Sequence, residues 1–290
     1  MSTGIGGPIF AWFQAVASEK CLATLVNFVA FDQSGRTLVS LVLATQAPNA
    51  AGSGALAEPE IFASVQGEGP SAGAPVAFVR LSRCNLACVW CDTAYTWHFE
   101  GDERPHRSGV TWDRRANQVT LPVAEVAERI RALGQKRLVV TGGEPILQAG
   151  PLAELLEVVD DMTVEIETNG TTRAPPRLDI RIDQYNVSPK LAHSGNPASL
   201  ALIPERLAAY AADPRAWFKF VIAAPGDVDE VLALRRAYAI PSGRIFLMPE
   251  GTDSATLRQR EEWLVPLCLE HGYRLSDRLH IHLFGDTRGT

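Results

Sequence analysis

The chain has 290 residues, 46% of them hydrophobic and 21% charged, which is the composition of an ordinary globular protein with a large core. The formal net charge is −6 and no run of lysine or arginine occurs, so nucleic acid and anionic membranes are not expected as partners. No apolar stretch predicts a membrane span, and the N-terminus lacks the basic start of a signal peptide.

The first 57 residues differ in pattern from the rest of the chain. Two strand-like runs, residues 25–30 and 38–44, are separated by a polar turn, and a linker of small residues follows at 46–54. This stretch is either a short accessory hairpin or a segment without a stable fold. We expect residues 1–57 to form a weakly ordered extension and residues 58–290 to form the core domain.

From Glu60 onward, predicted strands alternate with predicted helices. The strands cover residues 76–81, 137–140, 162–166, 182–187, 217–222 and 245–248. The helices cover residues 122–133, 151–159, 204–212, 228–238 and 256–269. Such alternation predicts parallel βα units, and about six strands are too few to close an eight-stranded barrel. We therefore expect an α/β fold, a partial and open TIM-like barrel, with its site at the carboxyl ends of the strands.

Three cysteines follow the first of these strands with the spacing C-x3-C-x2-C, at Cys84, Cys88 and Cys91. Three thiolates on one short loop can hold three irons of a cubic [4Fe–4S] cluster and leave the fourth iron open to a substrate or cosubstrate. The alternative is a structural zinc site with a fourth ligand such as His98, which would make the chain a zinc-stabilised interaction module. Thiols kept free for a cluster imply the reducing cytoplasm.

Polar residues recur where later strands end. Thr141 is followed by two glycines and Glu144, and glycines let a backbone approach a ligand closely. Alternation places Glu165 and Glu167 on one face of the next strand. A hydroxyl and a cation follow the strand after that, in the segment 188–190. Because the strands themselves are apolar, these residues favour one shared site.

Upstream of the cysteines, the run Gln66-Gly67-Glu68-Gly69 combines polar side chains with flexible positions. Arg80 lies inside an apolar strand, where a buried guanidinium needs a partner. That partner is either a carboxylate of the core or the carboxylate of a substrate, which a guanidinium can bind with two parallel hydrogen bonds.

Together these motifs resemble the radical S-adenosylmethionine (SAM) superfamily and, within it, the 7-carboxy-7-deazaguanine synthase family. The resemblance covers about residues 58–290, in family order, and rests on IFASVQGEG, FVRLSRCNLACVWCDTAYTW, TGGEP, ETNGT, VSPK, MPEG and RLHIHLFGDTRGT. It implies a lyase that converts 6-carboxy-5,6,7,8-tetrahydropterin to 7-carboxy-7-deazaguanine with loss of ammonia, in queuosine and other 7-deazapurine biosynthesis. Another radical SAM enzyme, such as a glycyl-radical activase, is the alternative, although QGEG and CDT are not expected there.

The resemblance also implies the cofactors, the site residues and the partners. A [4Fe–4S] cluster would be held by Cys84, Cys88 and Cys91, and Mg²⁺ by Thr93. SAM, used as a regenerated cofactor, would contact Trp90, Cys91, Asp92, Gly142, Gly143, Glu144, Glu167, Ser188, Pro189 and Lys190. The pterin would contact Val65, Gln66, Gly67, Glu68, Arg80, Thr141 and Thr290. No protein side chain is expected to act as a catalytic acid or base. An electron donor such as flavodoxin or ferredoxin and a homodimer are also implied.

Overall fold

The computed structural model describes residues 30–31, 37–47 and 57–290 of the chain. The chain divides into two compact units, residues 1–37 and 38–290. Strand β1 (Ala30–Phe31) pairs with β2 (Thr37–Leu38) in a two-stranded sheet, and the other described elements belong to the second unit. No helix within the described ranges has both the length and the apolar character that crossing a membrane requires.

The second unit is built on a 10-stranded sheet whose central strands are parallel and follow one another in chain order. These strands are β5 (Pro75–Leu81), β7 (Arg137–Gly142), β8 (Thr163–Thr168), β9 (Gln184–Val187), β10 (Ala216–Ile222), β11 (Ile245–Pro249) and the short β12 (Arg274–Leu275). Because neighbours in sequence are neighbours in space and the sheet ends at β12 and β6, the expected open, barrel-like arrangement is confirmed.

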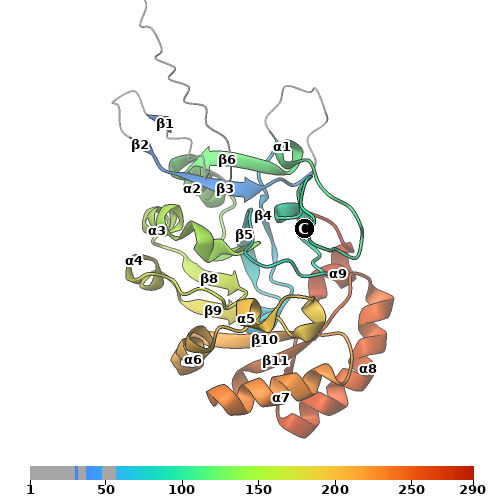
Figure 1. Ribbon diagram of the computed structural model, residues 1–290. Helices are drawn as coiled ribbons and strands as arrows, with labels where there is room; N and C mark the ends of the chain where they lie inside the picture. The colour runs from blue at the N-terminus through green and yellow to red at the C-terminus, as the bar shows by residue number, and fades with distance from the viewer. Residues whose placement is uncertain (1–29, 32–36, 48–56) are drawn as a thin grey trace, which may run out of the picture. The chain divides into compact units, whose positions relative to one another are not determined.

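Helices connect the parallel strands and lie outside the sheet, following one another in chain order (Figure 1). They are α2 (Val123–Ala132), α3 (Ala149–Val158), α4 (Pro176–Asp179), α6 (Pro204–Ala212), α7 (Asp227–Tyr238) and α8 (Ser254–His271). Helix α2 shows why they pack there, because Val123, Val126, Ala127 and Ile130 recur at helical spacing and are buried. Each large apolar side chain buried in this way stabilises the fold by about 1.5–3 kcal/mol.

Three antiparallel strands extend the sheet beyond β5: β3 (Ser40–Ala44), β4 (Ile61–Val65) and β6 (Gln118–Pro122). Strand β3 lies between β5 and β6, and the side chains of Leu41 and Leu43 are fully buried. The second unit therefore begins at Leu38, before the expected start of the core domain at residue 58. The expectation of weak order for the remainder of 1–57, including the strand at 25–30, falls almost entirely outside the described residues.

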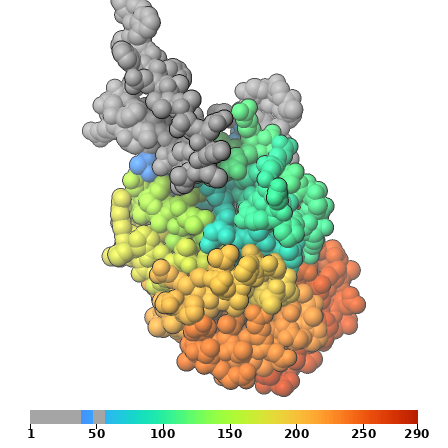
Figure 2. All heavy atoms as spheres, viewed as in Figure 1, coloured from blue at the N-terminus to red at the C-terminus, as the bar shows by residue number. Residues whose placement is uncertain are grey.

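Short elements in the connections between strands and helices complete the second unit. They are η1 (Gly69–Ser71), η2 (Ala94–Thr96), α1 (Arg114–Asn117), η3 (Pro145–Gln148), η4 (Ala192–Ser194), α5 (Ala198–Ala201), η5 (Ser242–Arg244) and α9 (Leu279–Phe284). The segment after β9, yellow in the space-filling view, meets the teal and green atoms of the cysteine loop and the chain that follows it (Figure 2).

Candidate functional site

A cavity of about 230 Å³ opens at the carboxyl ends of the parallel strands. Its lining contains nearly every site residue expected from the sequence: Val65, Gln66, Gly67, Glu68, Arg80, Cys84, Cys88, Trp90, Cys91, Asp92, Thr93, Thr141, Gly142, Gly143, Glu167, Ser188, Lys190 and Thr290. The exceptions are Glu144 and Pro189. The fold thus gathers segments that are far apart in sequence around one space.

The cysteine loop leaves β5 through Arg83, whose φ of 80° lies in the left-handed region that favours glycine. Hydrogen bonds hold this strained residue, because its N–H donates to Thr96 O at 2.7 Å and its carbonyl accepts from Glu144 N at 2.9 Å. Burial raises the pKa of Cys84 to about 12 and that of Cys88 to about 11. A metal centre bound here must therefore displace protons, since thiolates are the ligands.

A single zinc ion does not fit these three thiols. Among the described residues, the potential ligands that converge within 4.8 Å of one another are Glu261, Asp277 and His282, a group without a cysteine. Zinc holds sulfur at about 2.3 Å, which would bring the thiols within about 4 Å of one another. His98, the candidate fourth ligand, uses Nδ1 in a 2.8 Å contact with the Val110 carbonyl. The three thiols lie farther apart than ligands of one zinc ion do, and such spacing suits a cluster with several metal atoms.

The two remaining cysteines differ from the loop. Cys268 lies buried in α8 as part of the main apolar core, where burial raises its pKa to about 11. It does not line the cavity, as expected for a structural residue. Cys21 lies outside the described residues.

The two glycines after β7 allow close packing against the cysteine loop. A Cβ on Gly142 would lie 1.9 Å from the Leu81 carbonyl oxygen, and Gly142 has a φ of 140°. A Cβ on Gly143 would lie 2.1 Å from the Arg83 carbonyl oxygen. Both glycines also line the cavity. Both glycines thus lie against the backbone of residues 81 and 83, and the absence of their side chains lets β7 pack close to the start of the cysteine loop.

Glu144 is turned away from the cavity and is fully buried. Its carboxylate accepts hydrogen bonds from Thr168 Oγ1 at 3.0 Å, Asn169 N at 2.8 Å and Ile146 N at 3.1 Å. Burial raises the pKa of this carboxyl group. The carboxylate thus ties the loop after β7 to the loop after β8, and the expected contact of Glu144 with SAM stays a prediction. Pro189 likewise does not reach the cavity lining.

Arg80 has a carboxylate of the core as a partner, which is one of the two alternatives that its sequence position left open. Its Nε donates to Glu60 Oε1 at 2.8 Å, and Glu60 also accepts a hydrogen bond from the Tyr95 hydroxyl at 2.8 Å. Burial lowers the pKa of Arg80, but the Glu60 carboxylate outweighs this effect and keeps the guanidinium charged. Among the described residues nothing accepts a hydrogen bond from its two Nη atoms, and Arg80 lines the cavity. The outer edge of the guanidinium is therefore available to an anion.

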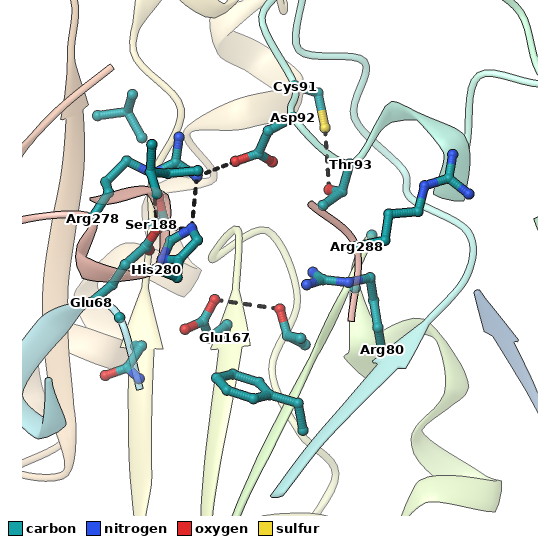
Figure 3. A pocket seen from close by; sticks show the side chains of 18 of the residues that line it. Glu68, Arg80, Cys91, Asp92, Thr93, Glu167, Ser188, Arg278, His280 and Arg288 are labelled. Atoms are coloured by element: carbon teal, nitrogen blue, oxygen red, sulfur yellow. Dashed lines mark hydrogen bonds and ion pairs between the residues drawn. The ribbon is translucent and has the colours of Figure 1, made fainter. Parts of the chain in front are cut away.

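Glu167 lines the cavity at the end of β8, and a dashed line in the close-up view marks one of its hydrogen bonds (Figure 3). It accepts hydrogen bonds from Gln66 Nε2 and Thr141 Oγ1, both at 3.3 Å. Glu165 shares its face of β8, as alternation predicted, but is fully buried and pairs with Arg137. Only the carboxylate of Glu167 can therefore contact a ligand.

Sequence reasoning missed a network of charges beside Glu68. Glu68 pairs with Lys219 of β10 and with Arg278 Nε at 3.1 Å, and Arg278 also pairs with Asp92 (Figure 3). Burial opposes ionisation of Glu68, but Lys219 and Arg278 hold its pKa well below the usual range. Lys219 carried a usable signal, because it interrupts an apolar strand in the same way as Arg80 does.

His280 also lines the cavity, and the sequence patterns did not identify it. Burial lowers the pKa of its imidazole, which is therefore neutral near pH 7. Gly67 makes room for it, since a Cβ there would lie 2.2 Å from His280 Nδ1. The motif RLHIHLFGDTRGT includes residues 278–282, but nothing in its pattern assigns these side chains to the cavity.

Trp90 has a buried indole Nε1–H without a hydrogen-bond partner among the described residues. An orphaned buried donor costs about 1–3 kcal/mol, so its position in the cavity lining suits a ligand with an acceptor group. Lys190 Nζ lies 5.6 Å from the centre of the Trp90 ring and donates to Ser188 Oγ at 2.8 Å. Thiol ligands, an unpaired donor and a nearby cation together fit a metal cluster with a polar cosubstrate.

Comparisons with known proteins agree with this geometry. A model of the radical SAM superfamily matches residues 79–189. The 7-carboxy-7-deazaguanine synthase of Pyrobaculum aerophilum is 39% identical over 235 residues, which cover 79% of this chain and 95% of the relative. That of Hyperthermus butylicus is 36% identical and covers 77% and 90%. The crystal structure of QueE from Escherichia coli matches with a TM-score of 0.55 at 26% identity, covering 76% of this chain and 92% of that one.

Proposed function

This chain belongs to the 7-carboxy-7-deazaguanine synthase family, and we propose that its cavity converts 6-carboxy-5,6,7,8-tetrahydropterin to 7-carboxy-7-deazaguanine with loss of ammonia. It is a radical SAM enzyme of 7-deazapurine biosynthesis. The observation that carries the proposed substrate is the single cavity that joins the cysteine loop to Arg80 and Glu167. A cofactor bound to the loop would there face an anionic, polar substrate.

Cys84, Cys88 and Cys91 would hold the [4Fe–4S] cluster. When bound, the cluster and SAM supply the radical that abstracts a hydrogen atom from the substrate. Trp90 would donate its free indole N–H to SAM, and Lys190 and Ser188 would bind its polar groups from the end of β9. The protein contributes orientation and the exclusion of water rather than proton transfer.

Arg80 would bind the carboxylate of the pterin through its two Nη atoms. Glu60 holds the inner edge of the guanidinium, so the outer edge is already oriented before the substrate arrives. Gln66 and Thr141 would supply hydrogen-bonding groups for the ring of the pterin, and Glu167, which accepts a hydrogen bond from each of them, would contact SAM. Preset groups of this kind lower the ordering cost of binding.

Thr93 would provide a neutral oxygen to Mg²⁺. Its Oγ1 lies 3.5 Å from Cys91 Sγ and lines the cavity, close to where substrate and cofactor meet (Figure 3). Mg²⁺ prefers oxygen ligands and keeps several waters, so one hydroxyl together with substrate oxygens suits it better than the thiolates.

We also propose flavodoxin or ferredoxin as the electron donor, a homodimer as the assembly and the cytoplasm as the location. The first two proposals rest on the resemblance of the sequence motifs alone, and the free thiols of the loop support a reducing compartment.

Anaerobic turnover tests the proposed function. The reconstituted protein is given SAM, dithionite, Mg²⁺ and the carboxytetrahydropterin, and products are identified by mass. We expect 7-carboxy-7-deazaguanine and ammonia in equal amounts, with SAM not consumed in proportion. Reductive cleavage of SAM without a pterin-derived product would instead favour another radical SAM enzyme, such as a glycyl-radical activase.

A further inference from the structure

The segment that follows β9, residues 194–196, makes hydrogen bonds to three consecutive residues of the cysteine loop, 87–89. Asn196 Oδ1 accepts a hydrogen bond from Ala87 N at 2.9 Å, and Ser194 O accepts one from Val89 N at 2.9 Å. Between these two bonds, Asn196 Nδ2 donates to Cys88 Sγ at 3.3 Å. The side chain of Asn196 therefore contacts both the backbone and a cluster sulfur of this loop.

The orientation of the Asn196 amide follows from chemistry. The Ala87 N–H can only donate, so the atom facing it must be the carbonyl oxygen Oδ1. The amide nitrogen then has to face the sulfur of Cys88. Nδ2 also lies 3.2 Å from Ser194 Oγ, which accepts its second proton. Both N–H bonds of the amide are thus directed, one of them at the sulfur.

The local backbone is shaped for this approach. Gly195 has a φ of 78°, and a Cβ there would lie 2.7 Å from Val89 Cγ1. Ser194 is fully buried. A glycine in the left-handed region, directly before Asn196, lets the chain turn against the cysteine loop without a clash. The contact is therefore built by three successive residues, 194–196.

We propose that Asn196 sets the reduction potential of the cluster by donating an N–H···S hydrogen bond to Cys88. A hydrogen-bond donor stabilises negative charge on a ligand sulfur, and this charge grows when the cluster accepts one electron from a low-potential reductant. The bond therefore favours the reduced cluster, with no proton transferred. This inference rests on the proposed role of Cys88 as a ligand.

The other asparagine near a cluster cysteine makes a weaker contact. Asn169 Nδ2 lies 3.9 Å from Cys84 Sγ and donates mainly to Asn85 Oδ1 at 2.9 Å. The same substitution at the two positions should therefore have a larger effect at Asn196.

An EPR-monitored redox titration of the reconstituted protein, without SAM, tests the proposal. Asn196→Asp keeps the acceptor for Ala87 but replaces the donor with a negative oxygen, and Asn196→Leu removes both with similar volume. We expect the ratio of reduced to oxidised cluster at the wild-type midpoint to fall about threefold in Asn196→Leu. In Asn196→Asp it should fall about tenfold, which is about 59 mV for a one-electron couple. Asn169→Asp should shift less.

Ser194→Ala is the matched control, because it removes the hydroxyl that accepts the second proton of the Asn196 amide and leaves the bond to sulfur in place. Its ratio of reduced to oxidised cluster at the wild-type midpoint should stay within about twofold of the wild-type ratio. The midpoint does not depend on cluster occupancy, so partly loaded protein still gives the answer. Unchanged midpoints in both Asn196 variants, or loss of the cluster in both while Ser194→Ala loads normally, would reduce Asn196 to a structural clamp and overturn the proposal. Retention of the cluster in Cys88→Ala would be a separate failure, of the ligand assignment itself.

Discussion

The cavity has two walls of different chemistry. The cysteine wall, Cys84, Cys88, Trp90 and Cys91, consists of neutral thiols and one indole, with amide and hydroxyl donors beside the sulfurs. The charged wall consists of buried and half-buried ions that already have partners: Glu68, Arg80, Glu167, Lys219 and Arg278. A metal centre needs ligands that can lose protons, whereas a polar substrate binds best to charges fixed in advance. The difference supports the proposal that the cluster and the carboxylate of the substrate are held by separate sets of residues.

The largest effect is expected from Cys88→Ala on the cysteine wall. Removing one of the three ligands should abolish both the cluster and SAM cleavage. Cys268→Ala is the control, because Cys268 is buried in α8 away from the cavity and should leave iron content normal. Iron analysis and the visible spectrum after anaerobic reconstitution measure both variants. Four irons and full activity in Cys88→Ala would remove the distinction between the two walls.

The next largest effect concerns the scaffold of the cysteine wall. Strand β3 pairs with β5 at Leu43 and Leu81, and Val42 O accepts a hydrogen bond from Ser82 N at 2.9 Å, directly before the cysteine loop. A chain that starts at Ala57 lacks this strand and should fail to fold, whereas one that starts at Leu38 should fold. Circular dichroism and thermal unfolding decide. Equal stability of the two chains would show that β3 does not support the wall.

Lys219→Met tests the charged wall by removing one of the two cations that pair with Glu68, so that only Arg278 remains. We expect a loss of about 1.5–3 kcal/mol in the free energy of unfolding at pH 7. Lys136→Met is the control, because the Lys136–Asp161 pair is exposed and should contribute at most about 1 kcal/mol. Chemical denaturation measures both losses, and equal losses would show that the buried network carries no special stability.

The same variant has a defined pH dependence. The pKa of Glu68 in the folded protein lies below its unfolded value of about 4.3, so its ionised form stabilises the fold above that pH. This contribution is lost as the pH falls through the folded pKa. The destabilisation caused by Lys219→Met should therefore shrink below about pH 4.

Most of the scaffold was predictable, because buried parallel strands and their helices carry strong periodic signals. The antiparallel pairing of β3, β4 and β6 was not, since short strands do not specify their partners. The cysteine loop was found from its spacing. Lys219 lines the cavity and Glu144 is buried beside it without lining it, and both positions depend on packing between distant segments, which no local pattern encodes.

A smaller effect is expected where the two walls meet, at Thr93. Thr93→Val keeps the shape of the side chain and removes its oxygen. We expect lower turnover and a flatter dependence on Mg²⁺, with cluster content and SAM binding retained, because only the proposed Mg²⁺ ligand is lost. Steady-state rates across a Mg²⁺ titration give the answer, and full wild-type stimulation in the variant would place the metal elsewhere.

The most direct test of separate walls is ligand binding to Arg80→Lys, measured by anaerobic calorimetry on the reconstituted protein. Lysine keeps the charge but cannot form two parallel hydrogen bonds to a carboxylate. We predict an affinity for the carboxytetrahydropterin that is about tenfold to a hundredfold lower, since hydrogen bonds to charged groups contribute about 1.5–3 kcal/mol. The affinity for SAM, and for a tetrahydropterin without the carboxylate, should be unchanged. Equal losses for SAM and substrate, or none for the substrate, would contradict the account.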